Sequence, residues 1–332
     1  MSIVAVLGAG SWGTALADLL ARKGHDVRLW SYEPEVAAAV NSKHENPIYF
    51  AGATLHDGVV ASHDLAACLQ GAEAICSAAP SHVTRAVWRD AAPHVAPGTP
   101  LVCATKGMET DTLEFMNEVA AEAIPEAIFV ALSGPSFSTE VYQQQPTAIV
   151  AASTDDAALA SVQQLFSTAT FRVYSNADVI GVEIGGSIKN TMAIAAGILE
   201  GLGLGHNPRA ALLTRGLAEM SRLGVALGAH RETFAGLAGM GDLILTCTGD
   251  LSRNHQLGVE LARGVTLAEY RLTHRTVAEG VNTALAASRL AHRHDVEMPI
   301  TSQVAAILFE GAAPRDCIQT LMERTLKAER WG

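Results

Sequence analysis

Hydrophobic positions follow two different patterns along the chain, and the pattern changes near residue 178. Before it, apolar runs of four or five residues alternate with stretches of helical periodicity. The runs lie at residues 3–7, 27–30, 74–78, 101–104, 128–131, 147–150 and 171–174. Near-continuous apolar strands separated by helices are typical of a parallel sheet covered on both faces. We therefore expect residues 1–178 to form an α/β domain with a mostly parallel sheet.

After residue 178 the pattern is helical almost throughout. The segment Asn176-Ala177-Asp178 predicts a helix cap, and a long Ala- and Gly-rich helix is expected from Val179 to about residue 200. Glycines in its first turns, such as Gly185, cost helix propensity, so they indicate close approach of another helix backbone or of a ligand. Because strand signals are nearly absent beyond this helix, we expect residues 179–332 to form an all-α domain.

The first apolar run leads directly into a glycine-rich turn with the sequence Gly8-Ala9-Gly10-Ser11-Trp12-Gly13. In a strand–turn–helix, Gly8 makes the tight turn, Gly10 lets the backbone approach a pyrophosphate, and Gly13 lets helix and strand pack closely. The first N–H groups of the helix and the positive end of its dipole then face the anion. The turn therefore predicts a Rossmann-like, dinucleotide-binding domain at residues 1–178, and a chance Gly-rich turn is the alternative.

The end of the second apolar run bears on the choice between NAD and NADP. A carboxylate there accepts hydrogen bonds from a ribose 2′-OH, whereas a cation favours a 2′-phosphate. No acid stands at the strand tip itself, Glu33 follows it slightly late, and Arg28 can point to either face of the strand. These residues leave both cofactors open. The simpler role for Glu33 is a helix N-terminal acid beside Pro34, favoured by the helix dipole.

Composition and charge limit the class of protein and its ligands. Apolar residues make up 49% of the 332 residues and charged residues 17%, which predicts compact globular domains. The formal net charge of -11 disfavours nucleic acids and anionic membranes, so a phosphate-bearing ligand needs a few well-placed cations. No apolar run reaches the length of a membrane span, and the first run is a strand rather than a signal peptide. We expect a cytoplasmic protein without stable membrane insertion.

The cysteines are scattered, odd in number and without a C-x-x-C pair. They are Cys68, Cys76, Cys103, Cys247 and Cys317. This spacing argues against a disulfide framework and against a zinc site. We therefore expect no metal, and we expect most of these side chains to be small buried hydrophobic groups.

Candidate ligand-binding residues follow the predicted strands, because ligands bind at the carboxyl ends of parallel strands. Lys106 stands at such a strand tip beside a glycine, which favours a ligand contact over a solvated surface lysine. After the run at residues 128–131, Gly134 and Ser136 can offer backbone N–H groups and a hydroxyl. A simple turn is the alternative for these two residues.

The helical part contributes a lysine, an acid and a polar cluster. Lys189 lies in an otherwise apolar helix, where burial is costly unless the ammonium is paired or functional, so it is a candidate general acid/base. A lysine that reaches solvent at the helix edge is the alternative. Asp242 follows a glycine turn, and Ser252-Arg253-Asn254 combines groups that bind phosphate well. Taken alone, that cluster could equally be a helix cap.

Several short segments together carry a resemblance that runs almost end to end. They are the glycine-rich turn at residues 8–13, Thr105-Lys106-Gly107, Ser133-Gly134-Pro135-Ser136-Phe137, Ile184-Gly185-Gly186-Ser187-Ile188-Lys189-Asn190, Asn207-Pro208-Arg209-Ala210-Ala211-Leu212, Gly239-Met240-Gly241-Asp242-Leu243, Ser252-Arg253-Asn254 and Val277-Ala278-Glu279-Gly280. With these segments the chain resembles the NAD(P)-dependent glycerol-3-phosphate dehydrogenases of the bacterial type. No single motif is needed for the match.

The resemblance implies a role for many of these residues. Lys189 is implied as the proton donor or acceptor, with Lys106 and Asp242 as its catalytic partners. Contacts with glycerol 3-phosphate are implied for Lys106, Gly134, Ser136, Lys189, Asp242, Ser252, Arg253 and Asn254. Contacts with NAD or NADP are implied for Gly8, Gly10, Ser11, Trp12, Gly13, Tyr32, Lys106, Ser138, Arg253, Val277 and Glu279. The family more often has a basic residue near Tyr32, so a strong preference for NADP is not predicted.

The resemblance also implies the reaction, a reversible hydride transfer between the nicotinamide and C2 of dihydroxyacetone phosphate that yields sn-glycerol 3-phosphate. Lys189 supplies the proton as the carbonyl oxygen becomes an alkoxide. Lys106 polarises that oxygen and favours the neutral form of Lys189 by like-charge repulsion, while Asp242 orients the lysine or a substrate hydroxyl. The product would serve glycerophospholipid synthesis, and a homodimer formed through the helical domain is a further expectation.

Two other interpretations use the same features. One is a β-hydroxyacid dehydrogenase of the 6-phosphogluconate or hydroxyisobutyrate kind, which also joins a nucleotide domain to helices bearing a catalytic lysine. Lys106 and the Ser252-Arg253-Asn254 cluster argue against it. The other is a dinucleotide-binding sensor without catalysis, for which we would expect the lysine or the phosphate cluster to be missing. The sequence contains both.

Overall fold

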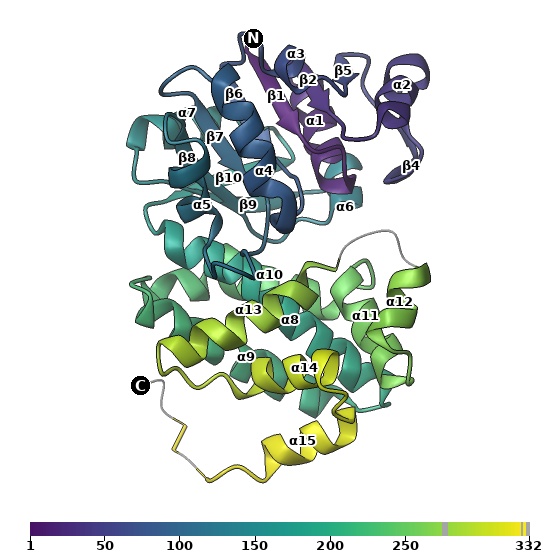
Figure 1. Cartoon of the computed structure of the whole chain (residues 1–332), viewed down its shortest axis with the longest axis vertical. Coiled ribbons are helices and arrows are strands. Elements are labelled where there is room, and N and C mark those ends of the chain that lie inside the picture. Colours follow the sequence, from purple (N-terminus) through teal and green to yellow (C-terminus); the bar gives the residue numbers. More distant parts are fainter. Residues whose placement is uncertain (274–277, 327, 330–332) are drawn as a thin grey trace. The chain divides into compact units, whose positions relative to one another are not determined.

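The computed structural model describes residues 1–273, 278–326 and 328–329. The chain divides into two compact units. The first comprises Met1–Lys106 and Glu114–Glu183, and the second comprises Gly107–Leu113 and Ile184–Gly332. The first unit combines strands and helices, and the second is helical, which confirms the predicted fold class (Figure 1).

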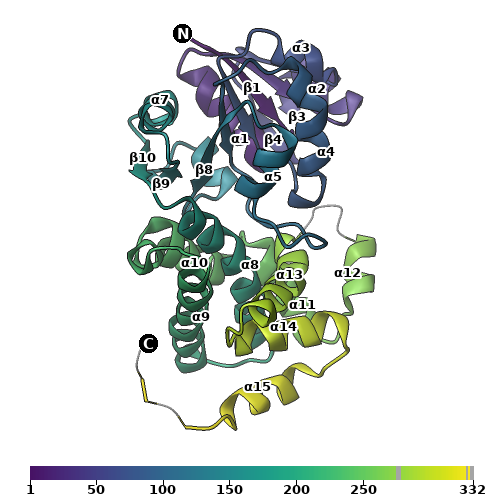
Figure 2. The ribbon, with the colours of Figure 1, turned by 60° about the vertical axis from the view of Figure 1, so that its left-hand side comes forward.

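The first unit is built on one eight-stranded sheet with the strand order β10-β9-β8-β7-β6-β1-β2-β5. The strands are β1 (Ile3–Leu7), β2 (Asp26–Trp30), β5 (Val59–Ser62), β6 (Ala74–Ser77), β7 (Pro100–Cys103), β8 (Ile128–Ser133), β9 (Thr147–Ala152) and β10 (Phe171–Asn176). Every neighbouring pair is parallel except β8 and β9, so the sheet is mostly parallel as predicted. Helix α7 (Asp156–Phe166) contacts the reversed strands β9 and β10 (Figure 2).

The sheet is buried on both faces, as the near-continuous apolar runs predict. Successive side chains of a strand point to opposite faces. On β1, Val4 and Val6 therefore belong to one hydrophobic cluster, whereas Ala5 and Leu7 belong to another. The helices of this unit are α1 (Ser11–Arg22), α2 (Pro34–Lys43), α3 (Leu65–Leu69), α4 (Ser81–Ala91), α5 (Met116–Ala123), α6 (Ser138–Tyr142) and α7. Figure 1 shows α4 lying across one face of the sheet.

Strands outside the predicted set lie at one edge of this unit. Edge strand β5 pairs with β2 only, and its Val60 is 56% exposed. A separate antiparallel pair is formed by β3 (Glu45–Asn46) and β4 (Phe50–Thr54). The strands β3 and β4 are short and interrupted by polar residues or glycine, and β5 is a run of only three apolar residues, so the search for apolar runs of four or five residues misses them.

The second unit consists of helices joined by short turns, and the part of it that the structure describes contains no strand. Its helices are α8 (Val179–Gly201, which begins in the first unit), α9 (His206–Ala226), α10 (Asp242–Thr248), α11 (Arg253–Ala262), α12 (Leu267–Thr273), α13 (Glu279–Arg293), α14 (Pro299–Phe309) and α15 (Pro314–Met322). Helix α8 begins and ends within one residue of its predicted limits. Short helical turns precede α10 at Arg231–Ala235 and Leu237–Gly241.

Glycines let the central helices of the second unit approach one another closely. A Cβ atom on Gly197 of α8 would lie 1.9 Å from the carbonyl oxygen of His255, and one on Gly258 of α11 would lie 2.1 Å from that of Ile194. A Cβ on Gly185 would lie 2.3 Å from the carbonyl oxygen of Ala238. The backbones therefore touch, which is the close approach that glycines within the helix predict.

All five cysteines are free and buried. None of the helices in the described ranges is both long enough and apolar enough to cross a membrane.

Candidate active site

The glycine-rich turn between β1 and α1 requires glycine at two of its positions. Gly8 has a φ of 107°, and a Cβ atom there would lie 2.9 Å from the backbone nitrogen of Ala79. A Cβ on Gly13 would lie 1.9 Å from the carbonyl oxygen of Gly8, so helix and strand pack in direct backbone contact. By contrast, a Cβ on Gly10 would meet no described atom within 4 Å. The space beside Gly10 is open to a ligand.

Polar groups at the start of α1 fit the anionic part of a dinucleotide. The first N–H groups of a helix have no partner within the helix, and the helix dipole adds positive potential there. Ser11 and Trp12 begin α1, and the buried Nε1 of Trp12 has no hydrogen-bond partner among the described residues. An orphaned buried donor beside an open helix N-terminus is what a bound pyrophosphate would satisfy.

The end of β2 places an acid, rather than a cation, near the start of α2. Glu33 occupies the N-cap position of α2, where its side chain makes no capping bond. Its carboxylate instead accepts hydrogen bonds from the hydroxyls of Tyr49 at 2.6 Å and Ser31 at 3.4 Å. Tyr32 is 81% exposed. Arg28 donates to the carbonyl oxygen of Gln70 at 2.5 Å, so its guanidinium is engaged elsewhere.

The residues expected at the tips of β7 and β8 meet at one carbonyl group. Lys106 Nζ donates to the carbonyl oxygen of Gly134 at 2.8 Å, and Ser136 Oγ donates to the same oxygen at 2.9 Å. Gly134 has a φ of 138°, and a Cβ on it would lie 3.0 Å from Cα of Ile149. The loop therefore requires glycine there. Ser138, predicted to contact the cofactor, is the first residue of α6 and is half-buried.

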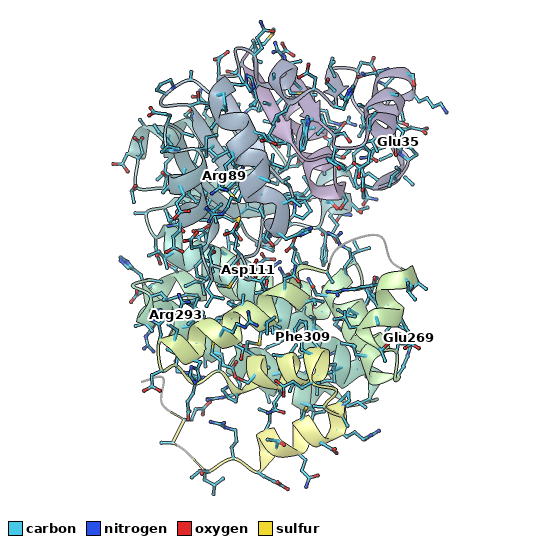
Figure 3. All side chains as sticks on the ribbon, viewed as in Figure 1. Glu35, Arg89, Asp111, Glu269, Arg293 and Phe309 are labelled. Carbon is cyan, nitrogen blue, oxygen red and sulfur yellow. The ribbon has the colours of Figure 1, made fainter. Side chains whose placement is uncertain are left out.

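Lys189 is buried and paired. Its Nζ donates to Oδ1 of Asp242 at 2.5 Å and to Oγ1 of Thr246 at 2.8 Å. Lys189 is 6% exposed and Asp242 is fully buried. Charged residues on the surface, such as Glu35 and Glu269, are exposed instead (Figure 3). A lysine that reaches solvent at the helix edge is therefore excluded.

Helix α10 explains why the lysine has two partners. Residues four apart lie on one face of a helix, so Asp242 and Thr246 face Lys189 together. Thr246 Oγ1 lies 3.2 Å from Oδ1 of Asp242, which completes a triangle of hydrogen-bonding atoms. Two fixed acceptors orient the ammonium, and the carboxylate stabilises its charged form. The arrangement can deliver a proton to an oxygen placed against Nζ.

Asn254 joins three helices through its side-chain amide. Its Nδ2 donates to Oδ1 of Asn190 at 3.0 Å, and its Oδ1 accepts from the backbone N–H of Gly280 at 2.9 Å. These bonds connect α11 with α8 and α13. The residue of α8 that Asn254 contacts, Asn190, directly follows Lys189 in the sequence. A Cβ on Gly280 would lie 2.6 Å from the carbonyl oxygen of Asn190, so α13 also needs its glycine.

The sequence left two roles open for the Ser252-Arg253-Asn254 cluster, phosphate binding and helix capping. Ser252 is the N-cap of α11, and its Oγ accepts from the backbone N–H of His255 at 3.3 Å. The helix-cap interpretation is therefore confirmed for this residue. Its hydroxyl hydrogen remains a donor. Arg253 is exposed at the start of α11, and the opposite charges of Arg253 and Glu279 attract each other.

Comparison with known proteins places the chain. The family model described as NAD-dependent glycerol-3-phosphate dehydrogenase N-terminus matches residues 3–159, and the model for the C-terminus of that family matches residues 178–319. The chain belongs to this family.

Similar proteins from other organisms agree with that membership. A glycerol-3-phosphate dehydrogenase [NAD(P)+] of Geobacter sulfurreducens is 53% identical over 331 residues, covering 99% of each chain. The crystal structure of a glycerol-3-phosphate dehydrogenase from Coxiella burnetii has a TM-score of 0.94 at 41% identity, covering 97% of this chain and 99% of that one. A glycerol-3-phosphate dehydrogenase of Saccharomyces cerevisiae has a TM-score of 0.81 at 26% identity, covering 96% and 99%.

Membership of the glycerol-3-phosphate dehydrogenase family does not favour the two alternative interpretations of the sequence. The matches cover the nucleotide-binding part and the helical part, so neither a β-hydroxyacid dehydrogenase nor a sensor without catalysis is needed to explain them. Val277, predicted to contact the cofactor, lies outside the described residues.

Sequence reasoning overlooked two residues of this site, Thr246 and Asn190. A threonine four residues after Asp242 carries a usable signal once a helix is assigned to residues 242–248, because the two side chains then share a face. Asn190 has no such signal, since its role depends on where α11 packs against α8.

Proposed function

We propose that this protein catalyses the reversible, NAD(P)-dependent interconversion of dihydroxyacetone phosphate and sn-glycerol 3-phosphate, with Lys189 as the general acid/base. The observation that carries the proposal is the buried Lys189, held by Asp242 and Thr246, in a chain of this family. A buried charged lysine is expensive, and a catalytic proton transfer is a reason to keep one.

The proton at the substrate oxygen is the step assigned to Lys189. During reduction, the C2 carbonyl oxygen gains negative charge and takes a proton from the ammonium, which becomes a neutral amine. During oxidation, the neutral amine removes the proton from the C2 hydroxyl. The bound nicotinamide cofactor supplies the chemistry of hydride donation and acceptance. Asp242 stabilises the ammonium before reduction, and Thr246 keeps Nζ aimed in one direction.

The substrate phosphate is assigned to the start of α11. Arg253 is exposed there and can bind phosphate with two parallel N–H bonds. Ser252 and Asn254 each keep a hydrogen-bond donor beyond those used for the helix cap and for Asn190. Lys106, Gly134 and Ser136 are also assigned to the substrate, with Lys106 as a catalytic group.

The cofactor is assigned to the glycine-rich turn and its neighbours. The observations that support this are the open space at Gly10 and the orphaned N–H of Trp12. The residues proposed to contact NAD or NADP are Gly8, Gly10, Ser11, Trp12, Gly13, Tyr32, Lys106, Ser138, Arg253, Val277 and Glu279.

The wider setting follows from the reaction. The product supplies the glycerol 3-phosphate backbone for phospholipid synthesis, and we place the enzyme in the cytoplasm as a homodimer. The net charge of -11 gives no support for nucleic acid as a partner. Light scattering coupled to size-exclusion chromatography tests the dimer, and a monomer mass at micromolar concentration would contradict it.

The initial rate of dihydroxyacetone phosphate reduction tests the function. The loss of reduced-nicotinamide absorbance is followed with NADH and with NADPH, and sn-glycerol 3-phosphate is identified as the product. A saturable rate with at least one cofactor is expected. If folded protein shows no rate with either cofactor but oxidises 3-hydroxyacids, the proposal is wrong.

A further inference from the structure

The segment between β7 and α5 carries Lys106 but contains no helix or sheet strand of its own. It comprises residues 104–115, and the boundary between the two compact units passes through it. Such a segment is held by side chains and turns rather than by a regular backbone ladder. The position of Lys106 therefore depends on its own bond to the carbonyl oxygen of Gly134 and on the bonds that fix the chain on either side of it, such as the one from Thr105 Oγ1 to the carbonyl oxygen of Ala79 at 2.7 Å.

The residue directly after Lys106 is fixed by a serine of α8. Ser187 Oγ donates to the carbonyl oxygen of Gly107 at 3.1 Å, and Ser187 is only 1% exposed. Because this bond is buried, water cannot replace it when the hydroxyl is removed, and the carbonyl group would lose its partner.

The other end of the segment is fixed by a glutamate of the same helix. Glu183 Oε1 accepts from the backbone N–H of Asn117 at 3.1 Å, in the first turn of α5. First-turn N–H groups have no partner within their helix, so the side-chain oxygen of Glu183 satisfies one of them. Glu183 is 8% exposed, and this bond is also shielded from water.

These two side chains share one face of α8. Glu183 and Ser187 are four residues apart, which places them one above the other. Lys189 follows two residues later, roughly 200° around the helix, and it points to Asp242 instead. One side of the helix thus anchors the segment that carries Lys106, while another side presents the proposed acid/base.

We propose that Ser187 and Glu183 are positioning residues for Lys106. They tie the backbone to the helix that carries Lys189 at two places, at Gly107 within the residue 104–115 segment and at Asn117 just after it. This inference rests on the proposed function, because it gives Lys106 a substrate to meet. Neither residue touches the substrate, and each acts through the chain that it holds.

Removal of the Ser187 hydroxyl tests the proposal. We expect Ser187→Ala to lower kcat/KM for dihydroxyacetone phosphate about tenfold and to lower the unfolding midpoint, because a buried carbonyl group loses its partner, while the variant stays folded under the conditions of the assay. Ser187→Cys keeps the side-chain size with a weaker donor, so we expect an intermediate loss. The matched control is Thr191→Val on the same helix face, because the buried Oγ1 of Thr191 has no partner among the described residues. It should keep wild-type kinetics.

A double-mutant cycle with Lys106→Ala separates positioning from general damage to the fold. If Ser187 acts through Lys106, then Ser187→Ala should change kcat/KM less than twofold in the Lys106→Ala background. An equal fold-loss in both backgrounds would overturn the proposal, as would wild-type kinetics for Ser187→Ala alone. Glu183→Gln, which keeps an acceptor for Asn117, should retain kcat/KM, whereas Glu183→Leu should lose about as much as Ser187→Ala.

The same assay keeps the two levels of inference apart. If the wild-type enzyme does not reduce dihydroxyacetone phosphate, the proposed function fails. If the wild type is active and the cycle is additive, only the positioning role fails.

Discussion

The ammonium of Lys189 and the carboxylate of Asp242 form an ion pair of 2.5 Å in which both groups are buried. Either charge alone would be strongly disfavoured at its position, so each group depends on the other. The carboxylate of Asp242 stabilises the protonated form of Lys189 and neutralises its positive charge when no substrate is present.

Replacement of Lys189 should separate catalysis from cofactor binding. We expect Lys189→Met to lower kcat/KM by about 10²- to 10⁴-fold, because the general acid is lost. It should also lower the free energy of unfolding by about 3–5 kcal/mol, since Asp242 is left buried without its partner. The dissociation constant of NADH, measured by fluorescence titration, should stay within twofold. The exposed Lys43→Met serves as control, and near-wild-type turnover in folded Lys189→Met would refute the assignment.

The hydroxyl of Thr246 should matter for turnover, although it was not predicted from the sequence. Thr246→Val removes one of the two acceptors that orient Nζ of Lys189, and we expect about a tenfold loss in kcat/KM. Thr248→Val is the matched control, since Thr248 lies on the same helix and donates to the carbonyl oxygen of Ile244. Equal kinetics for the two variants would mean that the Lys189–Thr246 bond has no part in the reaction.

Cofactor preference should follow from Glu33. Its carboxylate lies beyond the end of β2, where it would repel a 2′-phosphate and could accept from a ribose 2′-OH. We expect kcat/KM to be about tenfold higher with NADH than with NADPH, a difference of roughly 1.4 kcal/mol. Glu33→Gln should reduce that ratio, whereas Tyr49→Phe removes a hydrogen-bond donor, keeps the carboxylate and should preserve it. A wild-type preference for NADPH would contradict this expectation.

Stability should decrease as the pH rises from about 5 to 8. Burial raises the pKa of Glu183 from 4.5 to about 8, and it raises the pKa of Glu219 from 4.5 to about 7. The folded protein therefore keeps protons that the unfolded chain has already lost, and the free energy of unfolding falls with pH across this window. Their contribution is complete below pH 4.5 and is gone above pH 8.

Urea unfolding at a series of pH values checks this expectation. Glu183→Gln should flatten the curve up to about pH 8 and Glu219→Gln up to about pH 7. Glu219 accepts from the backbone N–H groups of Ile300 and Thr301 at the start of α14, and Gln replaces one of the two accepting oxygens by an amide group, so Glu219→Gln should also lower stability below about pH 7. If both variants keep the full wild-type slope, other groups cause the pH dependence.

Two glycines of the nucleotide turn should respond in opposite ways to alanine. Gly13→Ala would place Cβ 1.9 Å from the carbonyl oxygen of Gly8, so we expect a loss of more than about 2 kcal/mol in the free energy of unfolding. Gly10→Ala meets open space and should keep the fold, while its methyl group weakens NADH binding. Thermal melts and NADH titration distinguish the two, and an equally destabilised Gly10→Ala would show that the space is not free.

Much of the fold was predictable, because long buried elements leave a strong pattern. Each apolar run became a strand, and α8 lies at its predicted place because an uninterrupted apolar helix has a period that loops lack. The antiparallel pairing of β8 with β9 was not predictable. Both strands read as buried apolar runs, and direction depends on how the chain between them folds.

The sequence alone indicates those candidate site residues whose burial carries a high energetic cost. It does not indicate residues whose role depends on which distant residue they contact. Lys189 is recognisable because a buried cation in an apolar helix is energetically costly unless it is paired or functional. Ser187 looks like any small helical residue, and its value comes from Gly107, eighty residues away in sequence. Glu33 does stand at the start of α2, as the sequence predicts, but its carboxylate accepts a hydrogen bond from the hydroxyl of Tyr49 and does not cap the helix. Which residue contacts Ser187 or Glu33 depends on tertiary packing, which a single sequence does not show.

The contact of α8 with α11 through Gly197 and Gly258 limits how this enzyme could be re-engineered. Main chain lies against main chain at both positions, so neither helix can slide or rotate to accommodate a larger residue. Directed evolution toward bulkier or uncharged polyols is therefore expected to act through side chains, such as that of Arg253, for which we propose a contact with the phosphate. The main chain at this contact therefore sets the distance between the helix that carries Lys189 and the helix that carries Arg253, whatever side chains are placed around it.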